Sequence, residues 1–225
     1  MYHYVDDQDG SLFVSPENFE RQMVYLRDRG YRVISMDELT AGLKEGKEFS
    51  RNTVVITFDD GRRDNFTQAF PILSDYDYPA TFYVTTGLIG SGSFMSWDDL
   101  RLMSAEGMDI GSHTRSHVYL PDIDSPEALR EEIAGSRRDI IREIGQVPKH
   151  FCYPIGGFTL EAKAMVKRYG YSSAVTTNRG PGKRHDDLYA LQRVKVSNSD
   201  AVKPFHFFAK LSGYYNLFRS EKAGY

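Results

Sequence analysis

The sequence predicts one α/β domain spanning residues 1–225, folded as a distorted or incomplete (β/α) barrel of about seven parallel strands. First, strand and helix signals alternate from end to end, which is typical of βαβ units and a parallel sheet. Second, no internal repeat, low-complexity segment or linker divides the chain. Third, 225 residues with 40% hydrophobic residues are enough for one sizeable core. Periodicity alone leaves open whether the barrel closes.

The N-terminal half of the chain supplies the first strands and helices. We expect a strand at 2–5, and then a helix that begins at Ser15-Pro16 and ends near Gly30, because serine is a good N-cap and proline suits the first helical position. The elements expected next are a strand at 31–35, a short helix opened by the capping pair Ser35 and Glu38, a buried strand at 53–58, a helix at 65–73 and a strand at 80–84.

The C-terminal half continues the alternation. Ser96 and Asp99 form a second capping pair, which predicts a helix that stops at Gly107. The remaining expected elements are a strand at 108–112, a long helix from Ser125-Pro126 to residue 144, a strand at 150–154, a helix at 159–168, strands at 171–175 and 191–196, and an aromatic-rich amphipathic helix at about 200–218.

Composition excludes several classes of function. The net charge is −3 and no basic stripe or nucleic-acid motif is present, so we expect no nucleic-acid partner. The single cysteine, Cys152, excludes an internal disulfide and a thiolate metal cluster. No apolar run reaches the length of a membrane span, and no signal peptide is recognisable. Because a strand begins at once with residues 2–5, we expect an upstream export signal or anchor to be absent from this chain.

Two groups of polar residues follow two of the expected strands. Asp59 and Asp60 close the strand 53–58, and His113 and His117 follow the strand 108–112. The carboxyl ends of parallel strands meet at one edge of a sheet, where barrels carry their reactive residues. One carboxylate and two imidazoles make an open three-ligand site for a divalent metal, and the second carboxylate can act as a base beside it. The pattern indicates a metal-dependent hydrolase.

These motifs resemble the polysaccharide deacetylase family, carbohydrate esterase family 4, also called the NodB homology domain. The family's TFDDG motif stands at 57–61 and its H-[ST]-x-x-H motif at 113–117. The third motif is degenerate at 151–156, with Cys152 in the position of the usual arginine. The resemblance implies a NodB-like fold and the removal of acetyl groups from N-acetylglucosamine-containing polysaccharide by metal-activated water.

The resemblance also implies roles for individual residues. Asp59 would be the general base, and the backbone N–H of Ile155 would stabilise the oxyanion. The third-motif turn would contact substrate through Tyr153 and Pro154. The ligands of the metal, most commonly Zn²⁺ with other divalent ions also accepted, would be Asp60, His113 and His117.

Two roles lack their usual residues. The family's late leucine–histidine motif for the general acid is absent, since His185 and His206 do not fit it. His3 resembles the strand-end histidine of the circularly rearranged exopolysaccharide, or poly-N-acetylglucosamine, deacetylase branch, which implies that His3 is the acid. Arg193, on the expected strand 191–196, could replace the missing third-motif arginine and keep Asp59 ionised.

Other interpretations stay open at this stage. Asp59 and Asp60 alone could form a turn, the histidines could be structural, and Arg193 could be a structural ion-pair residue. The chain could instead hydrolyse a non-sugar amide or be a catalytically silent glycan-binding module. An extracytoplasmic location at the cell envelope is the expectation, with a cytoplasmic one still open. The particular glycan, the metal and the oligomeric state are not fixed by the sequence.

Overall fold

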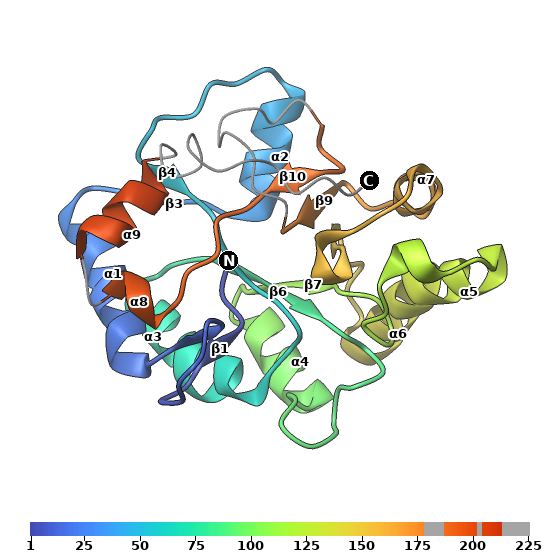
Figure 1. The fold of residues 1–225 in the computed structure, drawn as a ribbon, viewed down its shortest axis with the longest axis horizontal. Coiled ribbons are helices and arrows are strands. Elements are labelled where there is room, and N and C mark those ends of the chain that lie inside the picture. The colour runs from blue at the N-terminus through green and yellow to red at the C-terminus, as the bar shows by residue number, and fades with distance from the viewer. Residues whose placement is uncertain (178–186, 202–203, 213–225) are drawn as a thin grey trace.

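A computed structural model describes residues 1–177, 187–201 and 204–212. Its centre is a curved six-stranded parallel sheet, with helices packed around it (Figure 1). Each strand lies beside the next one along the chain, so the prediction of an incomplete parallel (β/α) barrel is confirmed. The strands of this sheet are β5 (Ile56–Phe58), β6 (Ala80–Val84), β7 (Asp109–Ser112), β8 (His150–Cys152), β9 (Ser173–Thr176) and β10 (Leu191–Gln192).

The N-terminal residues join the two edges of this sheet. Tyr2 pairs in parallel with Phe58 of β5, and its N–H donates to the Thr57 carbonyl at 2.8 Å. On the other side, Val196 N–H donates to the Met1 carbonyl at 3.0 Å. Segment 1–2 therefore fills the gap between β5 and the residues that follow β10, as an additional strand would. Two short parallel sheets flank it, β1 (Tyr4–Val5) with β2 (Phe13–Val14) and β3 (Arg32–Val33) with β4 (Thr53–Val54).

The helices begin where their capping residues predict. Ser15 accepts a hydrogen bond from Asn18 N–H at the start of α1, and Ser96 and Asp99 form the complete capping box of α4. The α-helices are α1 (Pro16–Asp28), α2 (Met36–Lys44), α3 (Phe70–Asp75), α4 (Trp97–Ala105), α5 (Pro126–Arg130), α6 (Ser136–Ile144), α7 (Leu160–Arg168), α8 (Asn198–Ala201) and α9 (Pro204–Leu211). Short 3₁₀ turns are η2 (Leu120–Asp122) and η4 (Pro154–Gly156).

Four predicted elements differ in detail from the structure. The strand 53–58 is divided between β4 and β5, which belong to different sheets. The helices at 65–73 and 126–144 each contain a π-helical segment, η1 (Asn65–Ala69) and η3 (Glu131–Gly135). A π turn holds an extra residue and is common beside functional sites. The C-terminal helix is described as α8 and α9 only, and the rest of the predicted helix to residue 218 lies outside the described residues, as does His185.

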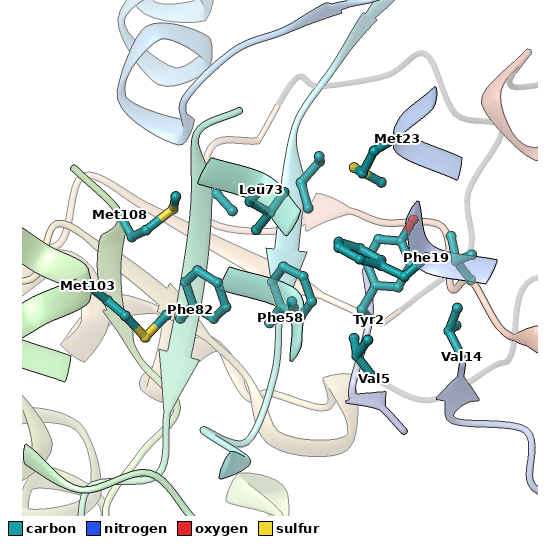
Figure 2. Close-up of a cluster of buried hydrophobic side chains, with 14 of the residues drawn as sticks. Tyr2, Val5, Val14, Phe19, Met23, Phe58, Leu73, Phe82, Met103 and Met108 are labelled. Atoms are coloured by element: carbon teal, nitrogen blue, oxygen red, sulfur yellow. The ribbon is translucent and has the colours of Figure 1, made fainter. Parts of the chain in front are cut away.

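Three aromatic rings from neighbouring strands stack in the core below the carboxyl edge of the sheet. Figure 2 shows Tyr2, Phe58 and Phe82 side by side, with Phe19 of α1 packed against them. The ring centroids of Phe58 and Phe82 are 4.6 Å apart and those of Tyr2 and Phe58 are 5.4 Å apart. This stack aligns the N-terminal segment with β5. His3 follows Tyr2 and Asp59 follows Phe58, so the pairing of Tyr2 with Phe58 makes His3 and Asp59 neighbours.

Both faces of the barrel sheet are buried. Helices cover the outer face, and side chains from the strands fill the interior. Inside, Tyr83, Cys152 and Leu191 pack together, with Met36 and Val175 in the same cluster. A cavity of about 860 Å³ is lined by residues of this cluster and of α2, together with Thr57 and Arg193. None of the candidate metal ligands lines it, so we place the functional site at the carboxyl edge instead. In the parts of the chain described, no helix is long and apolar enough to cross a bilayer.

Candidate active site

Asp60, His113 and His117 converge at the carboxyl edge of the sheet. Asp60 follows β5, and its Oδ1 lies 3.6 Å from His113 Nε2 and 3.3 Å from His117 Nε2. The three ligand atoms lie within 4.8 Å of one another. One carboxylate oxygen and two imidazole nitrogens at this spacing suit a divalent metal such as Zn²⁺, and three protein ligands leave a coordination position open.

A hydrogen bond to the backbone orients the His113 ring for metal binding. Its Nδ1 lies 2.8 Å from the Cys152 carbonyl oxygen. A carbonyl only accepts, so Nδ1 carries the hydrogen, and Nε2, which lies beside Asp60, is the nitrogen left to bind a metal. Metal-binding histidines typically use their second nitrogen in this way. Burial alone would raise the pKa of Asp60, but hydrogen bonds from the two histidines hold that pKa well below its usual range.

The backbone at the site adopts conformations that L-residues rarely take. Asp60, Thr114, His117 and Ile155 have φ angles of 75°, 66°, 59° and 59°. They are four of the five non-glycine residues with positive φ among those the structure describes. Such conformations cost energy and persist only where surrounding contacts enforce them, which happens most often at functional sites. The residues with unusual backbone conformations thus cluster at the same edge of the sheet as the candidate metal ligands.

Asp59 is held by Arg193 in the barrel interior. The guanidinium donates to both carboxylate oxygens, with Nη1–Oδ1 at 2.6 Å and Nη2–Oδ2 at 2.7 Å, and Nη1 also lies 3.1 Å from Thr57 Oγ1. Asp59 is 1% exposed. Burial by itself would raise the pKa of Asp59, but the charge and hydrogen bonds of Arg193 lower it to about 2. The carboxylate is therefore ionised at neutral pH.

Cys152 makes room for this arginine. Its Sγ lies 3.1 Å from Arg193 Nη2, on the neighbouring inner face of β8. A small side chain at the third-motif position leaves space for a guanidinium that enters from the segment after β10. Cys152 also forms a second possible metal group with Asp59 and His113. We disfavour that group because Arg193 occupies both oxygens of Asp59, and burial raises the pKa of the Cys152 thiol.

Replacing Arg193 tests its pairing with Asp59. Arg193→Met leaves a buried carboxylate without its cation, and we expect a loss of about 3–5 kcal/mol in the free energy of unfolding, since an unpaired buried charge is strongly destabilising. Urea denaturation measures this value. The double variant Arg193→Met/Asp59→Asn should be more stable than the sum of the single losses predicts, because it removes the orphaned charge. Additive losses would contradict the direct pairing.

His3 lies beside Asp59, as the aromatic stack requires. Its Nε2 is 4.0 Å from Asp59 Oδ2, and its carbonyl accepts a hydrogen bond from Asn65 Nδ2 at 2.9 Å. The ring is largely buried, and Nδ1 has no hydrogen-bond partner among the described residues. Burial lowers the pKa of His3, against the opposing effect of Asp59 and Asp60.

The third-motif turn presents its backbone rather than its aromatic ring. Ile155 is 64% exposed, and the hydrogen bonds of the turn are donated by Gly156 and Gly157. Tyr153, which we predicted to bind substrate, is fully buried, and its ring stacks on Phe158. Its hydroxyl donates to the Tyr189 carbonyl. The geometry does not support a substrate contact for the ring of Tyr153, and Pro154 is also buried.

Two residues near the metal group went unnoticed in the sequence. Arg62 Nε lies 3.7 Å from Asp60 Oδ2, and its guanidinium lies between the rings of Tyr4 and Phe94, 4.8 and 4.2 Å from their centroids. Glu132 contacts the loop between the two histidines. Arg62 follows the TFDDG motif directly, which could have drawn attention to it. No local pattern points to Glu132.

An incomplete parallel (β/α) barrel with an Asp–His–His group and an ionised carboxylate beside it is the arrangement of a hydrolase that activates water. Comparison with known proteins agrees. The family model described as polysaccharide deacetylase matches residues 46–174. YxkH of Bacillus subtilis strain 168 is 33% identical over 88% of this chain and 70% of its own length. The chain therefore belongs to the polysaccharide deacetylase family.

Two further relatives extend the similarity over almost the whole chain. The poly-beta-1,6-N-acetyl-D-glucosamine N-deacetylase of Staphylococcus aureus strain MRSA252 is 26% identical over 90% of this chain and 73% of its own. The structure of the Streptococcus pyogenes deacetylase PplD in complex with acetate superposes with a TM-score of 0.86 at 27% identity, covering 94% of this chain and 96% of the other. The chain is thus an enzyme of the deacetylase family with the NodB-like fold.

Proposed function

We propose that this protein removes acetyl groups from N-acetylglucosamine-containing polysaccharide, with Asp60, His113 and His117 as ligands of a divalent metal, most commonly Zn²⁺. The observation that carries the proposal is the position of Asp59. This carboxylate is ionised and directly precedes the ligand Asp60, at the same end of the strands as the two histidines. A silent binding module has no need for an ionised, buried base beside three ligands.

The residues of the chain have separate tasks in this reaction. When bound, the metal would supply Lewis acidity toward water and the acetyl carbonyl. Asp59 takes the proton from the attacking water, and Arg193 keeps it in its ionised, oriented form. The exposed turn at Ile155 offers its N–H to the oxygen of the tetrahedral intermediate, a role that is independent of the side chain.

His3 donates the proton that the departing amine needs. It lies on the N-terminal segment, with Nε2 4.0 Å from Asp59 Oδ2. Amines are poor leaving groups unless they are protonated, so a deacetylase needs an acid as well as a base. Placing the acid on the N-terminal segment agrees with the absence of the usual late histidine motif.

The substrate class and the location rest on relatives. The Staphylococcus aureus relative is named for poly-β-1,6-N-acetyl-D-glucosamine, and it covers most of this chain. We propose an N-acetylated glucosamine polymer as the substrate and the cell envelope, outside the cytoplasm, as the place of action. We also propose that residues 1–225 form a single catalytic domain, because the sheet, its edges and the candidate site share one barrel.

Acetate release from β-1,6-linked N-acetylglucosamine oligomers tests the function. We expect none after the metal is stripped with a chelator, and recovery when stoichiometric Zn²⁺ is restored, because Asp60 and the two histidines need a cation to polarise the amide. Metal content should be measured on the same samples. Full activity in the stripped protein would contradict the metal dependence. Stoichiometric zinc with no acetate from any glycan would favour a non-sugar amide substrate or a silent binding module.

A further inference from the structure

The loop between the two candidate ligand histidines is attached to the neighbouring helix by one carboxylate. Glu132 Oε2 accepts hydrogen bonds from the backbone N–H groups of Arg115 and Ser116, both at 3.0 Å. Its Oε1 accepts from the Ser116 hydroxyl. One side chain therefore takes three hydrogen bonds from the two residues in the middle of the H-T-R-S-H motif.

This loop has a backbone that needs support. Thr114 and His117 both have positive φ angles, which are unfavourable for residues other than glycine. Without Glu132, the Arg115 and Ser116 N–H groups would depend on water for a hydrogen-bond partner. A carboxylate that accepts two adjacent N–H groups fixes the direction of both peptide planes. His117 is the next residue, so its ring position depends on those planes.

The opposite side of the loop is fixed by close contact with the β6–α4 connection. Thr86 and Gly87 N–H donate to the carbonyls of Thr114 and Arg115 at 3.1 and 2.8 Å. A Cβ on Gly87 would lie 2.5 Å from the Arg115 carbonyl oxygen, so only glycine allows this approach. The loop's carbonyls are thus held from one side and its N–H groups from the other, where Glu132 is the acceptor.

Glu132 lies in the π-helical segment η3, and its neighbour has a different role. Glu131 is bound on the surface by Arg138, with Oε2 at 2.7 Å from Nη2. Among the described residues, Glu131 accepts only from arginine side chains, and the second of these is Arg115, whose Nη1 lies 3.5 Å from Glu131 Oε2. The two adjacent glutamates have similar chemistry and both lie near the loop, but Glu132 alone bonds to its backbone. Glu131 is therefore a natural control.

We propose that Glu132 is a positioning residue for the metal group, holding the 114–117 loop so that His117 Nε2 stays beside Asp60 Oδ1. It touches neither the metal nor the substrate. The proposal rests on the proposed function insofar as Asp60, His113 and His117 bind a metal. Its consequence is that the loss of Glu132 weakens metal binding without removing a ligand.

The test compares Glu132→Gln with Glu131→Gln by zinc affinity, measured by competition with a chromogenic chelator, and by thermal unfolding of the metal-free protein. The neutral amide introduced by Glu132→Gln lacks the negative charge that strengthens the hydrogen bonds from the two backbone N–H groups. Its NH₂ group also requires the Ser116 hydroxyl to turn and accept, so the loop is held less firmly. We expect zinc affinity to decrease by about 10–100-fold in Glu132→Gln. Mutation of residues that orient metal ligands without binding the metal typically has an effect of this size. Glu131→Gln should bind zinc as the wild type does.

The possible outcomes separate this proposal from its premise. Unchanged zinc affinity in Glu132→Gln overturns it, and so does a lower melting temperature of the metal-free protein with unchanged affinity, which shows a purely structural role. If the wild type binds no zinc, the proposed metal group fails instead. Should Glu132→Gln not fold, Ser116→Ala removes one of the three hydrogen bonds, and the proposal then requires a smaller loss of affinity, with no loss counting against it.

Discussion

Asp59→Asn should lose nearly all acetate release while keeping its metal. Asparagine has the shape of aspartate and can still accept a hydrogen bond from Arg193, but it cannot take a proton from water. General-base catalysis typically contributes about 10²–10⁴-fold to a rate, so we expect kcat to fall by that factor. Zinc affinity should be unchanged because the ligand set lacks Asp59. Turnover by the zinc-reloaded variant, beside its zinc content, is the measurement.

The matched control for this variant is Asp109→Asn. Asp109 is a partly buried aspartate at the end of a strand, but it is the first residue of β7, at the opposite end of the barrel, where it accepts a hydrogen bond from Thr81 Oγ1 at 3.0 Å. It should retain turnover, which separates chemistry from the general effect of removing a charge at a strand end. Equal losses in both variants, or a large drop in zinc binding by Asp59→Asn, would contradict the base assignment.

The helices and the convergence of the candidate metal ligands could be predicted from the sequence because both depend on short patterns. The capping residues Ser15 and Ser96 act on N–H groups within three residues, so their effect is local. The proposed ligands Asp60, His113 and His117 follow strands that end at the same edge. Both the helix starts and the common edge of the ligands can be predicted without knowing how distant segments of the chain pack. These are the parts of the fold and site for which sequence reasoning was most informative.

The partner of Asp59 depends on topology. Arg193 is 134 residues away, and it reaches Asp59 only because the segment after β10 and β5 meet across the N-terminal residues. From the sequence, this pairing could be stated only as a hypothesis, because the third motif lacks its usual arginine and another arginine had to take its place. Glu132 is a harder case, since its bonds to the 113–117 loop depend on the π turn in η3, which has no recognisable sequence signal.

The position of Tyr153 could have been deduced. Side chains alternate between the two faces of a strand. The resemblance places at position 152 an arginine that pairs with the base, which implies an inward-facing position, so the next residue is expected to point outward, toward the helices. The structure shows this directly, with Cys152 in the interior cluster and Tyr153 packed with Phe151 and Phe158 in the outer one. The family motif predicted that the turn contacts substrate, but the alternation of side chains along the strand before it predicts a buried Tyr153.

His3→Ala should lose far more activity toward an acetamide than toward an activated acetate ester. Amine departure needs a proton, and loss of a general acid typically costs about 10²–10⁴-fold. A nitrophenolate leaves without a proton, so the hydrolysis of 4-nitrophenyl acetate should be nearly unaffected. Asp59→Asn, in contrast, should lose both activities, because the attack of water precedes either departure. The ratio of amide to ester turnover is the measurement.

This ratio also separates chemistry from structure at the N-terminal segment. His3 is next to Tyr2, whose ring belongs to the stack with Phe58, and its carbonyl is bound by Asn65. Replacing its side chain leaves these contacts in place, so the segment should still join the two edges of the sheet. If His3 only supported the fold, both substrates would suffer equally and the melting temperature would fall. A selective loss on the amide is expected only if the imidazole of His3 delivers the proton to the leaving nitrogen.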